Sequence, residues 1–382
     1  MKIVFTGGGS GGHFYPIIAV VEAIRELSKE RKILPPKLYY FAPTKYNPRA
    51  LYDNEIEFVA IPAGKIRRYF SLLNITDAFV TGLGILKAIF SLYSVYPDVV
   101  FGKGGYASFP TLVAARLLRI PVVIHESDSH PGRVNAWASK FARYIAVAYP
   151  DAVEYFKKAH GQKTEEKIAL IGSPVREGIR IPLSNGAAEF LHLEEGLPCV
   201  LVLGGSQGSV TINDALIESL PDLVKDMQII HQTGRNNFKE VSGTAGIVLK
   251  DNPNASRYHP FEYLNDLAIR MSAGVSSVVI SRAGSTIFEI AVWGLPSIII
   301  PISEEVSHDQ TKNAFAYARS GACSVIEEHN LSSHILTAEI QKIVNDKTIQ
   351  DRMKSNTKDF GHSDSAAKLA AALLAIGLEH EK

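Results

Sequence analysis

Short apolar runs alternate with longer segments of helical periodicity through the first half of the chain. Runs of four or five apolar residues bounded by turn residues are typical of strands buried on both faces of a parallel sheet. In most intervening segments, apolar residues recur every three or four positions, as on the inner face of a covering helix. The predicted strands comprise residues 3–6, 38–42, 58–61, 99–102, 122–125, 145–148 and 168–171. This alternation predicts an α/β fold with a parallel sheet covered on both faces.

The same pattern begins again after a stretch of turn residues at 180–186, which we interpret as a linker. The strands predicted beyond it comprise residues 200–203, 229–231, 278–281 and 298–301. We therefore expect two Rossmann-like, doubly wound domains, at residues 1–178 and 179–360, and an amphipathic helix at 365–378. Two such domains imply a cleft between the carboxyl ends of two facing sheets, where sheets of this kind bind ligands.

A glycine loop, Thr6–His13, joins the first predicted strand to a helix expected to begin near Ile17. Five of the six residues at positions 7–12 are glycine, more than a tight turn needs. Glycines let the backbone approach a ligand, and the free N–H groups of a helix's first turn attract anions, so we expect an anion site. Pro16 fits the first helical turn. His13 is the only titratable side chain in the loop.

This loop is not the dinucleotide fingerprint. That fingerprint spaces its glycines G-x-G-x-x-G and is followed about 20 residues later by an acidic ribose ligand. Here the second predicted strand ends in Pro43-Thr44-Lys45, without a carboxylate. A nicotinamide-dependent enzyme is therefore disfavoured.

Three further loops follow predicted strands. In the loop at 102–108, Lys103 and its neighbouring glycines could hold an anion or form a plain turn. In the Gly-Gly-Ser-Gln-Gly loop of the second half, Ser206 could donate to a phosphate oxygen. In the third loop, Gly284 opens a helix whose first-turn amides suit a phosphate. One turn on, Glu289 either accepts from a ribose diol or compensates the helix dipole.

Polar residues follow two more predicted strands. The segment Glu304–Asn313 places acids, a histidine and amides before a helix. There Ser307 or Asp309 could cap the helix, or the amides could bind sugar hydroxyls. His125–Asp128 ends a strand of buried type, so we expect its side chains to emerge at the cleft rather than in the core.

Composition narrows the chemistry. A chain of 382 residues with a net charge of +1 is long enough for two globular domains and is not typical of a nucleic-acid binder. Cys199 and Cys323 lie far apart in a pattern that fits a reducing cytosol. Because the first residues form a predicted strand and glycine loop, we expect no secretory signal. The sequence has no His/Cys metal set, nucleophile elbow or P-loop lysine motif. An activated-ester donor whose diphosphate is neutralised by backbone amides, without metal or cofactor, fits best.

The apolar stretch 75–96 is the nearest approach to a membrane span. Asp77 and Lys87 interrupt it, so we expect no transmembrane helix. We interpret its apolar face as core packed on a sheet. The residues of that face are Phe79, Leu83, Leu86, Phe90 and Tyr93. The basic, aromatic lead-in before it is the better candidate for contact with an anionic bilayer. That lead-in comprises Lys65, Arg67, Arg68, Tyr69 and Phe70.

Six motifs occur together in an order that resembles one family. They are residues 7–13, 104–108, 125–126, 173–176, 204–208 and 281–284. As a set, running from residue 1 to about residue 321, they resemble the MurG family of N-acetylglucosaminyltransferases. The resemblance implies the two-domain B-type glycosyltransferase (GT-B) fold, with acceptor and membrane sites on the first domain and UDP-GlcNAc on the second. It also implies a C-terminal helix, residues 361–382, that crosses back to the first domain.

The same resemblance implies a reaction. In this family, N-acetylglucosamine passes from UDP-GlcNAc to the 4-hydroxyl of undecaprenyl-diphospho-N-acetylmuramoyl-pentapeptide. This inverting, metal-independent transfer converts lipid I to lipid II in peptidoglycan synthesis. It implies a peripheral enzyme at the cytoplasmic face of the cell membrane.

Residues at matching positions inherit implied roles. The implied contacts to UDP-GlcNAc are Ser10, Gly11, Gly12, Asp128, Arg176, Ser206, Leu264, Gly284, Ser285, Thr286, Glu289, Gln310 and Asn313. The implied contacts to the acceptor's diphosphate are Gly9, Gly12, His13, Gly104, Gly105 and Tyr106. The implied bilayer contacts are Lys65, Arg67, Arg68, Tyr69, Phe70 and Phe79. His13 is the base or a diphosphate ligand, and a neutral histidine with a pKa near 6.5 suits a base at cytosolic pH.

At Asp128 the chain departs from the family's usual sequence. Asp128 stands where the family usually has Asn, and a carboxylate accepts hydrogen bonds but cannot donate them. Asp128 is therefore a doubtful sugar contact or a second candidate base.

Three other functions are compatible with these motifs. They are a GT-B transferase with another lipid acceptor, a UDP-GlcNAc 2-epimerase and a non-enzymatic nucleotide-sugar-binding module. The joint presence of Gly104-Gly105-Tyr106 and Gly204–Gly208 argues against the first, and the epimerase would need no membrane surface.

Overall fold

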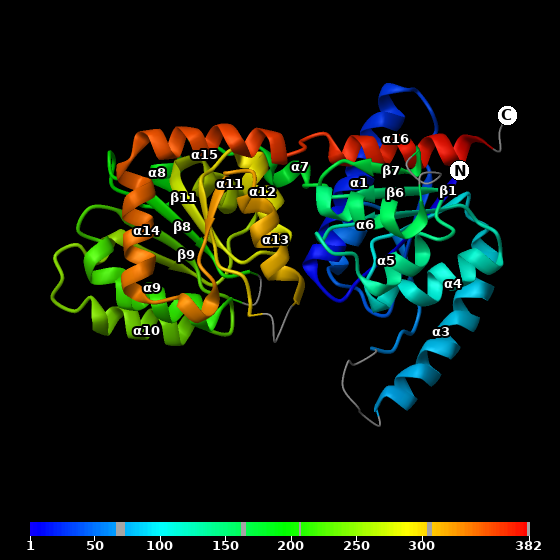
Figure 1. Ribbon diagram of the computed structural model, residues 1–382, viewed down its shortest axis with the longest axis horizontal. Helices are drawn as coiled ribbons and strands as arrows, with labels where there is room; N and C mark the ends of the chain where they lie inside the picture. The colour runs from blue at the N-terminus through cyan, green and yellow to red at the C-terminus, as the bar shows by residue number, and fades with distance from the viewer. Residues whose placement is uncertain (66–72, 162–165, 206–207, 304–307, 380–382) are drawn as a thin grey trace. The chain divides into compact units, whose positions relative to one another are not determined.

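The chain folds into two compact α/β units. The computed structural model describes residues 1–65, 73–161, 166–205, 208–303 and 308–379. The first unit contains Met1–Arg176 and Ser363–Lys382, and the second contains Glu177–His362. Each unit is built on one sheet whose strands are all parallel, with helices on its two faces (Figure 1), which confirms the predicted fold class.

The sheet of the first unit has seven strands in the order β3-β2-β1-β4-β5-β6-β7. Their bounds are β1 (Lys2–Thr6), β2 (Lys37–Ala42), β3 (Ile56–Ala60), β4 (Val99–Gly102), β5 (Val122–Glu126), β6 (Tyr144–Val147) and β7 (Ile168–Leu170). Each of the seven strands predicted in this half is present. The order reverses between the neighbouring strands β1 and β4, and ligands of such sheets bind at the carboxyl end of this switch point. The glycine loops at 7–12 and 102–105 both leave the sheet there.

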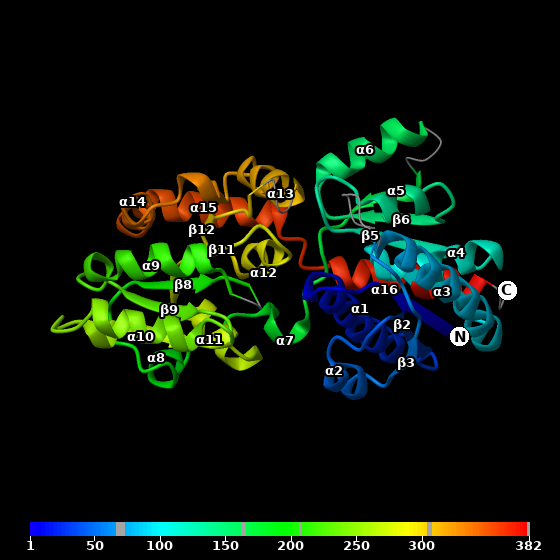
Figure 2. The same ribbon diagram turned by 90° about the horizontal axis from the view of Figure 1, so that it is seen from below.

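Seven helices cover the first sheet within the described residues. They are α1 (Gly11–Glu30), α2 (Pro48–Asp53), α3 (Leu73–Val95), α4 (Phe109–Leu117), α5 (Arg133–Ala138), α6 (Pro150–His160) and α16 (Ser365–Leu378). Side chains alternate along β1, so Ile3 and Phe5 pack in one core with α1 and α16, and Val4 packs in another with α3 to α6. The C-terminal helix α16 thus completes the first unit by packing along α1 (Figure 2).

Helix α1 begins earlier than the sequence indicated. It starts at Gly11, inside the glycine loop, so Pro16 lies within the helix rather than in its first turn. Proline has no N–H to donate to the carbonyl four residues back. The expectation for Pro16 was therefore wrong, because Gly11 and Gly12 already form the first turn of the helix.

The sheet of the second unit has six strands in the order β10-β9-β8-β11-β12-β13. Their bounds are β8 (Cys199–Leu203), β9 (Gln228–Gln232), β10 (Tyr258–Phe261), β11 (Ser276–Ser281), β12 (Ser297–Ile299) and β13 (Cys323–Val325). The edge strands β10 and β13 were not predicted, because both are short and β10 contains Pro260. The switch point lies between β8 and β11, so the loops that follow these two strands leave the sheet side by side.

The helices of the second unit are α7 (Glu177–Arg180), α8 (Ala187–Phe190), α9 (Val210–Leu223), α10 (Phe238–Val248), α11 (Asp266–Val275), α12 (Thr286–Trp293), α13 (His308–Ala318), α14 (Ser333–Asn345) and α15 (Lys347–Phe360). The turn-rich segment 180–186 packs against α11. Leu183 donates its N–H to the Arg270 carbonyl at 2.9 Å, and Arg270 donates to the Ile181 carbonyl at 2.8 Å. This segment is therefore part of the second unit.

Helix α3 exposes the apolar face that we expected to be core. Phe79 is 69% exposed, Phe90 72% and Tyr93 73%, whereas the small residue Ala88 and Leu92 are buried on the opposite side. The core interpretation of this face was therefore wrong. Asn74–Val95 is also the one stretch in the described residues long and apolar enough to cross a membrane by length and composition. The absence of a transmembrane helix stays a prediction.

Candidate active site

The first glycine loop lies directly against the second. A side chain at Gly7 would bring its Cβ within 2.8 Å of Lys103 Cβ, so glycine is required there by packing. The Lys103 N–H donates to the Thr6 carbonyl at 2.8 Å, which continues the pairing of β1 with β4 past the strand ends. The Tyr40 hydroxyl donates to the Gly7 carbonyl from below. Part of the glycine content is therefore structural, and it draws the two loops together.

The His13 imidazole lies in the first turn of α1 and faces the second loop. Its Nδ1 is 2.9 Å from Ser10 Oγ. A Cβ built on Gly105 would lie 3.5 Å from His13 Nε2, so this nitrogen points across to that glycine. Burial, reinforced by the charge of Lys103, lowers the pKa of His13 to about 4. The imidazole is therefore neutral at cytosolic pH, as expected, but it is less basic than the ordinary histidine that we assumed.

The residues implied for the acceptor's diphosphate come together in this place. Gly104 and Gly105 have φ angles of +87° and +76°, and a Cβ on Gly104 would lie 2.7 Å from Asn135 Nδ2. A Cβ on Gly9 would lie 3.2 Å from the ring of Tyr106, which spans the gap between the two loops. Gly12 belongs to the first turn of α1. Glycine backbone, His13 and Tyr106 thus surround one position at the switch point.

The ammonium of Lys65 lies near the Tyr106 ring. Its Nζ lies 5.6 Å from the centre of the Tyr106 ring, a cation–π distance. Phe79, the other predicted bilayer contact that the structure describes, lies on α3. The remaining predicted bilayer contacts, Arg67, Arg68, Tyr69 and Phe70, lie outside the described residues.

The side chains at the end of β5 are buried rather than presented to a ligand. His125 is 0% exposed and Glu126 3% exposed, so the expectation that they emerge from the sheet edge was wrong. The His125 ring nitrogen Nε2 lies 2.9 Å from the Gly172 carbonyl. Burial lowers the pKa of His125 well below its ordinary value, with the Lys103 charge as second cause. Of the segment 125–128, Ser127 and Asp128 are the residues that reach partial exposure.

Glu126 holds the loop that follows β5. Its carboxylate accepts from the backbone N–H groups of Asp128 at 2.9 Å and Gly132 at 3.0 Å, and from Asn135 Nδ2 at 3.0 Å. Burial first, and the Asp128 carboxylate second, raise the pKa of Glu126 to about 7. Asn135 also donates to the His125 carbonyl at 3.0 Å. Asn135 was missed from the sequence, because its role depends on a contact across a loop rather than on a motif.

Arg176 stacks on an aromatic ring at the start of α1. Its guanidinium carbon lies 4.3 Å from the centre of the Tyr15 ring, within cation–π range. Tyr15 also lies against the predicted donor contact Gly11, where an added Cβ would be 3.4 Å from the ring. Arg176, Gly11 and, one residue earlier, Ser10 therefore form a second group of predicted donor contacts beside His13. Tyr15 itself was not identified from the sequence.

In the second unit, the described donor contacts of the prediction follow the strands β10, β11 and β12. Ser206 lies outside the described residues. Gly208, with a φ of +77°, fits so closely beneath residue 233 that an added Cβ would lie 2.0 Å from the Thr233 carbonyl oxygen. The next residue, Ser209, caps α9 by accepting from the Ile212 N–H at 3.3 Å. The loop is thus fixed at its helical end.

Gln232 joins this loop to the predicted uracil contact. Its Oε1 accepts from the Leu264 N–H at 2.9 Å, and its Nε2 donates to the Gly205 carbonyl at 3.3 Å. The Leu264 N–H is thus engaged within the protein. Gln232 is 7% exposed, and sequence reasoning missed it because both its partners lie far away along the chain.

Arg282 ties three loops of the same edge together. Its guanidinium donates to Ser209 Oγ at 2.7 Å, to Glu328 at 2.5 Å and to the Ile300 and Pro301 carbonyls at 3.2 Å. Burial alone would raise the pKa of Glu328, but the hydrogen bond from Arg282 and the Ser303 N–H outweigh burial and lower it. This partly buried network joins the loops that follow β8, β11 and β12.

The other predicted donor contacts surround the start of α12. Gly284 and Ser285 precede the helix, Thr286 is its first residue and the partly exposed Glu289 lies one turn on. Asn313 of α13 donates to the Ala283 carbonyl at 3.4 Å, and Gln310 accepts from the Ile302 N–H at 3.3 Å. Asp309 lies inside α13 and is not its cap, and Ser307 is outside the described residues.

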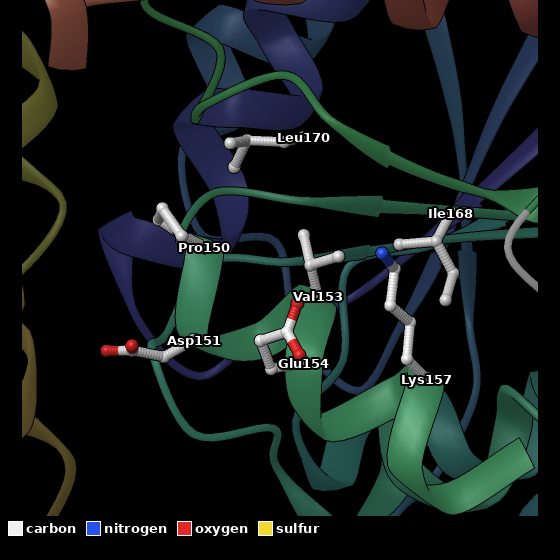
Figure 3. Close-up of a pocket in the computed structure, with 7 residues that line it drawn as sticks. All are labelled: Pro150, Asp151, Val153, Glu154, Lys157, Ile168 and Leu170. Atoms are coloured by element: carbon white, nitrogen blue, oxygen red, sulfur yellow. The ribbon is translucent and has the colours of Figure 1, made fainter. Parts of the chain in front are cut away.

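A separate cavity of about 490 Å³ lies between α6 and the edge strand β7 (Figure 3). It is lined by Pro150, Asp151, Val153, Glu154, Lys157, Ile168 and Leu170. None of the predicted site residues is among them, so we assign this cavity no part in the site. The described residues also hold no group of three or more His, Cys, Asp or Glu side chains arranged to bind a metal ion.

Known proteins resemble both units. Residues 3–147 match the glycosyltransferase family 28 N-terminal domain, and residues 199–369 match the family's C-terminal domain. A MurG crystal structure from Acinetobacter baumannii has a TM-score of 0.71 at 21% identity, covering 98% of this chain and 99% of that one. A UDP-GlcNAc 2-epimerase from Neisseria meningitidis has a TM-score of 0.68 at 16% identity, covering 98% and 100%. These likenesses confirm the GT-B fold and do not by themselves separate the two activities.

Sequence identity separates them. The chain is 36% identical over 374 residues to the UDP-N-acetylglucosamine--N-acetylmuramyl-(pentapeptide) pyrophosphoryl-undecaprenol N-acetylglucosamine transferase of Legionella pneumophila (strain Paris), covering 97% of this chain and 96% of that protein. It is 33% identical over 384 residues to the transferase of the same name from Treponema denticola, covering 96% and 93%. The chain therefore belongs to the MurG-type family of N-acetylglucosamine transferases within glycosyltransferase family 28.

Proposed function

We infer that this chain transfers N-acetylglucosamine from UDP-GlcNAc to the 4-hydroxyl of undecaprenyl-diphospho-N-acetylmuramoyl-pentapeptide, which converts lipid I to lipid II. The observation that carries this inference is the 36% identity to a transferase whose name states both substrates, over nearly the full length of both chains. The fold supports it, because both sheets present glycine loops at their switch points, where diphosphates are bound.

In this proposal the first unit receives the acceptor. The diphosphate lies between the loops at 7–12 and 102–105, where backbone N–H groups and the first turn of α1 attract negative charge. His13 Nε2 then takes the proton of the 4-hydroxyl. For that, Nδ1 must carry the ring hydrogen and donate it to Ser10 Oγ, 2.9 Å away, so the observed contact suits the tautomer that catalysis needs.

The second unit receives the nucleotide in the same proposal. The Leu264 carbonyl meets the uracil, Glu289 holds the ribose diol, and Gln310 and Asn313 contact the sugar. As the bond to UDP breaks, negative charge grows on its diphosphate. The N–H groups and helix dipole at the start of α12, after Gly284, stabilise that charge in this proposal. Arg176 adds a positive charge from the first unit, and we propose that the transfer needs no metal.

Asp128 is the second candidate for the base. Its backbone N–H is held by Glu126, and its side chain is partly exposed at the same sheet edge as His13. We propose His13 as the base, because its orientation is fixed by Ser10, and we propose Asp128 as an acceptor for a hydroxyl of the donor sugar. The two assignments predict different losses of kcat for substitutions at His13 and at Asp128, so rate measurements distinguish them.

We propose further that the exposed apolar face of α3 meets the bilayer at the cytoplasmic face of the membrane. Phe79, Leu83, Leu86, Phe90 and Tyr93 are each at least half exposed. A face of this kind beside basic residues inserts into the boundary between headgroups and acyl chains of an anionic bilayer. It would hold the protein where a lipid-linked acceptor is found.

One assay separates this function from its rivals. The full chain is incubated with UDP-[14C]GlcNAc and a short-chain lipid I analogue, and the products are resolved by chromatography. A labelled disaccharide lipid is the expected product. The fold likeness to UDP-GlcNAc 2-epimerases makes epimerisation the second candidate. A labelled nucleotide sugar of changed mobility, formed without acceptor, would establish it and overturn our inference.

A further inference from the structure

Lys103 is a buried ammonium whose Nζ has no hydrogen-bond partner among the described residues. Its side chain is 0% exposed, and Nζ is one of the buried polar atoms that no described group contacts by a hydrogen bond. Removing an ammonium from water is costly unless neighbouring groups compensate for the lost hydration. A methionine or leucine would fill the same volume without that cost. The charge therefore calls for a functional account.

The position of Lys103 is fixed by both glycine loops. Its N–H donates to the Thr6 carbonyl at 2.8 Å, and its Cβ occupies the space that a side chain on Gly7 would need. Two residues further on, Gly105 faces His13 Nε2. Lys103 therefore lies beneath the two glycine loops, close to His13. Because Nζ has almost no exposed surface, it acts through its field and not by contact with a substrate.

Ionisable groups from several elements surround this region. His13 belongs to α1, Tyr40 to β2 and Tyr106 to the short 3-10 helix η1 (Tyr106–Ser108), while His125, Glu126 and Asp128 belong to β5 and its loop. Burial lowers the pKa of Lys103 to about 8, and the Glu126 and Asp128 carboxylates oppose that fall. The same ammonium lowers the pKa values of His13 and His125 after burial has done so. Lys103 is thus the charge that both histidines sense.

We propose that Lys103 is a positioning residue for the base: its buried charge adds to the effect of burial and holds down the basicity of His13 until an anionic diphosphate occupies the two glycine loops. This inference rests on the proposed function, since it assigns His13 and the loops their parts in the transfer. A bound diphosphate brings negative charge beside His13 and offsets the field of Lys103. Occupancy by the acceptor therefore makes the imidazole a stronger base at the moment when a base is needed.

The proton balance of the transfer shows why this matters. The O–H bond of the acceptor breaks, its proton goes to His13 Nε2, and the oxygen electron pair forms the new bond to C1 of the sugar. The bond from C1 to the diphosphate oxygen breaks, and UDP leaves with that electron pair. An imidazolium forming near the Lys103 ammonium would be disfavoured by repulsion of like charges. With the diphosphate in place, the imidazolium has a counter-charge.

The test is a titration of His13 in the full chain, labelled with [13C]histidine and followed by NMR. The chain has twelve histidines, and the His13→Gln variant identifies the signal of interest. We expect Lys103→Met to raise the titration midpoint of His13 by about one pH unit, as removal of a nearby like charge does. Saturating inorganic pyrophosphate should raise the midpoint in the wild type and shift it less in Lys103→Met. The exposed Lys29→Met is the matched control and should change neither value.

Two results would overturn the proposal. The first is a His13 titration midpoint in Lys103→Met that equals the wild-type midpoint. If Lys103→Met folds poorly, the more polar Lys103→Gln takes its place in this comparison. The other is a wild-type midpoint that saturating pyrophosphate leaves in place. Failure of the proposed function would be seen in a different experiment, since wild-type protein would then form no labelled disaccharide lipid. A wild type that makes this product, with a His13 that ignores Lys103, would refute this inference alone.

Discussion

Ser10 Oγ lies 2.9 Å from Nδ1 of His13, one turn of helix away, and this contact decides which ring nitrogen faces the second glycine loop. If Nε2 is the base, Nδ1 carries the hydrogen and Ser10 accepts it. The hydroxyl then orients the ring without entering the reaction. We therefore expect substitution of His13 to lower the rate far more than substitution of Ser10.

We predict that His13→Ala lowers kcat by roughly two to four orders of magnitude, the range for losing a general base. Ser10→Ala should lower it by only about fivefold to tenfold, because one orienting hydrogen bond contributes about 1 kcal/mol. Steady-state rates on a short-chain lipid I analogue check both values. Asp128→Asn is the comparison. If Asp128→Asn lowers kcat by roughly two to four orders of magnitude while His13→Ala keeps most of its rate, Asp128 is the base.

Glu289 gives a prediction on the donor side. Glu289→Ala should raise the KM for UDP-GlcNAc, since the ribose diol loses its acceptor, and should leave the KM for the lipid acceptor nearly unchanged. The expected rise is about tenfold, from loss of a charge-assisted hydrogen bond. Initial rates at varied donor concentration measure it. An unchanged KM for UDP-GlcNAc would leave Glu289 with the dipole role that its place in the first turn of α12 also permits.

Gln232 gives a prediction about positioning. Gln232→Met removes the hydrogen bonds to Leu264 N–H and the Gly205 carbonyl and should raise the KM for UDP-GlcNAc about tenfold. Gln232→Glu keeps the acceptor for Leu264 and loses the donor to Gly205, so its KM should fall between the two.

The matched control is Gln228, at the other end of the same strand. It is equally buried, and its amide makes hydrogen bonds with the backbone of Glu194, at 3.0 Å and 2.9 Å. Gln228→Met should lower the melting temperature without raising the KM. Equal effects of the two substitutions on KM would show that Gln232 acts through stability alone.

Sequence periodicity located the sheets well and the faces of one helix badly. Apolar runs identify strands such as β1 and β8 because a strand buried on both faces has no polar positions. The apolar residues of α3 have the spacing of a core helix, yet the structure exposes them. Helical periodicity reports that a face is apolar and not what covers it, so a core face and a bilayer face give the same pattern.

The chemistry of the site depended on contacts that sequence does not carry. Glycine loops marked both switch points, because close approach of backbone leaves a compositional trace. The low pKa of His13 arises from burial and from Lys103, which is 90 positions away in the chain and adjacent only once β1 pairs with β4. Asn135 and Gln232 are ordinary polar residues in the sequence and become positioning groups through folding.

His231 gives a prediction about acid stability. It is buried in the second unit, between the Tyr258 hydroxyl at 2.9 Å and Asn213 Oδ1 at 3.0 Å. Burial lowers its pKa from 6.5 to about 3. Between about pH 3 and pH 6.5, the His231 side chain is therefore protonated in the unfolded chain and neutral in the folded chain. The stability linked to His231 is fully present above pH 6.5 and is lost as the pH falls towards 3.

The measurement is urea denaturation of wild type and His231→Gln at pH 7 and pH 5. Gln keeps a donor and an acceptor but does not titrate. The variant should be less stable at pH 7, and the difference should shrink by about 2 kcal/mol at pH 5, since each pH unit below 6.5 is worth about 1.4 kcal/mol. The exposed His329→Gln should show no such change. A difference that is equal at both pH values would contradict the prediction.

The exposed face of α3 gives a prediction about membrane binding. Phe79→Asp combined with Phe90→Asp should weaken binding to vesicles of anionic phospholipid by at least roughly tenfold, because each buried phenylalanine contributes about 1.5–3 kcal/mol and each new carboxylate is repelled. Sedimentation with vesicles measures the bound fraction. Leu34→Asp is the control, since Leu34 is 90% exposed in the same unit but lies outside α3. Activity on a water-soluble acceptor analogue should survive in the double variant, because neither phenylalanine belongs to the glycine loops. Vesicle binding that both the double variant and the Leu34 variant retain would place the membrane contact elsewhere on the chain.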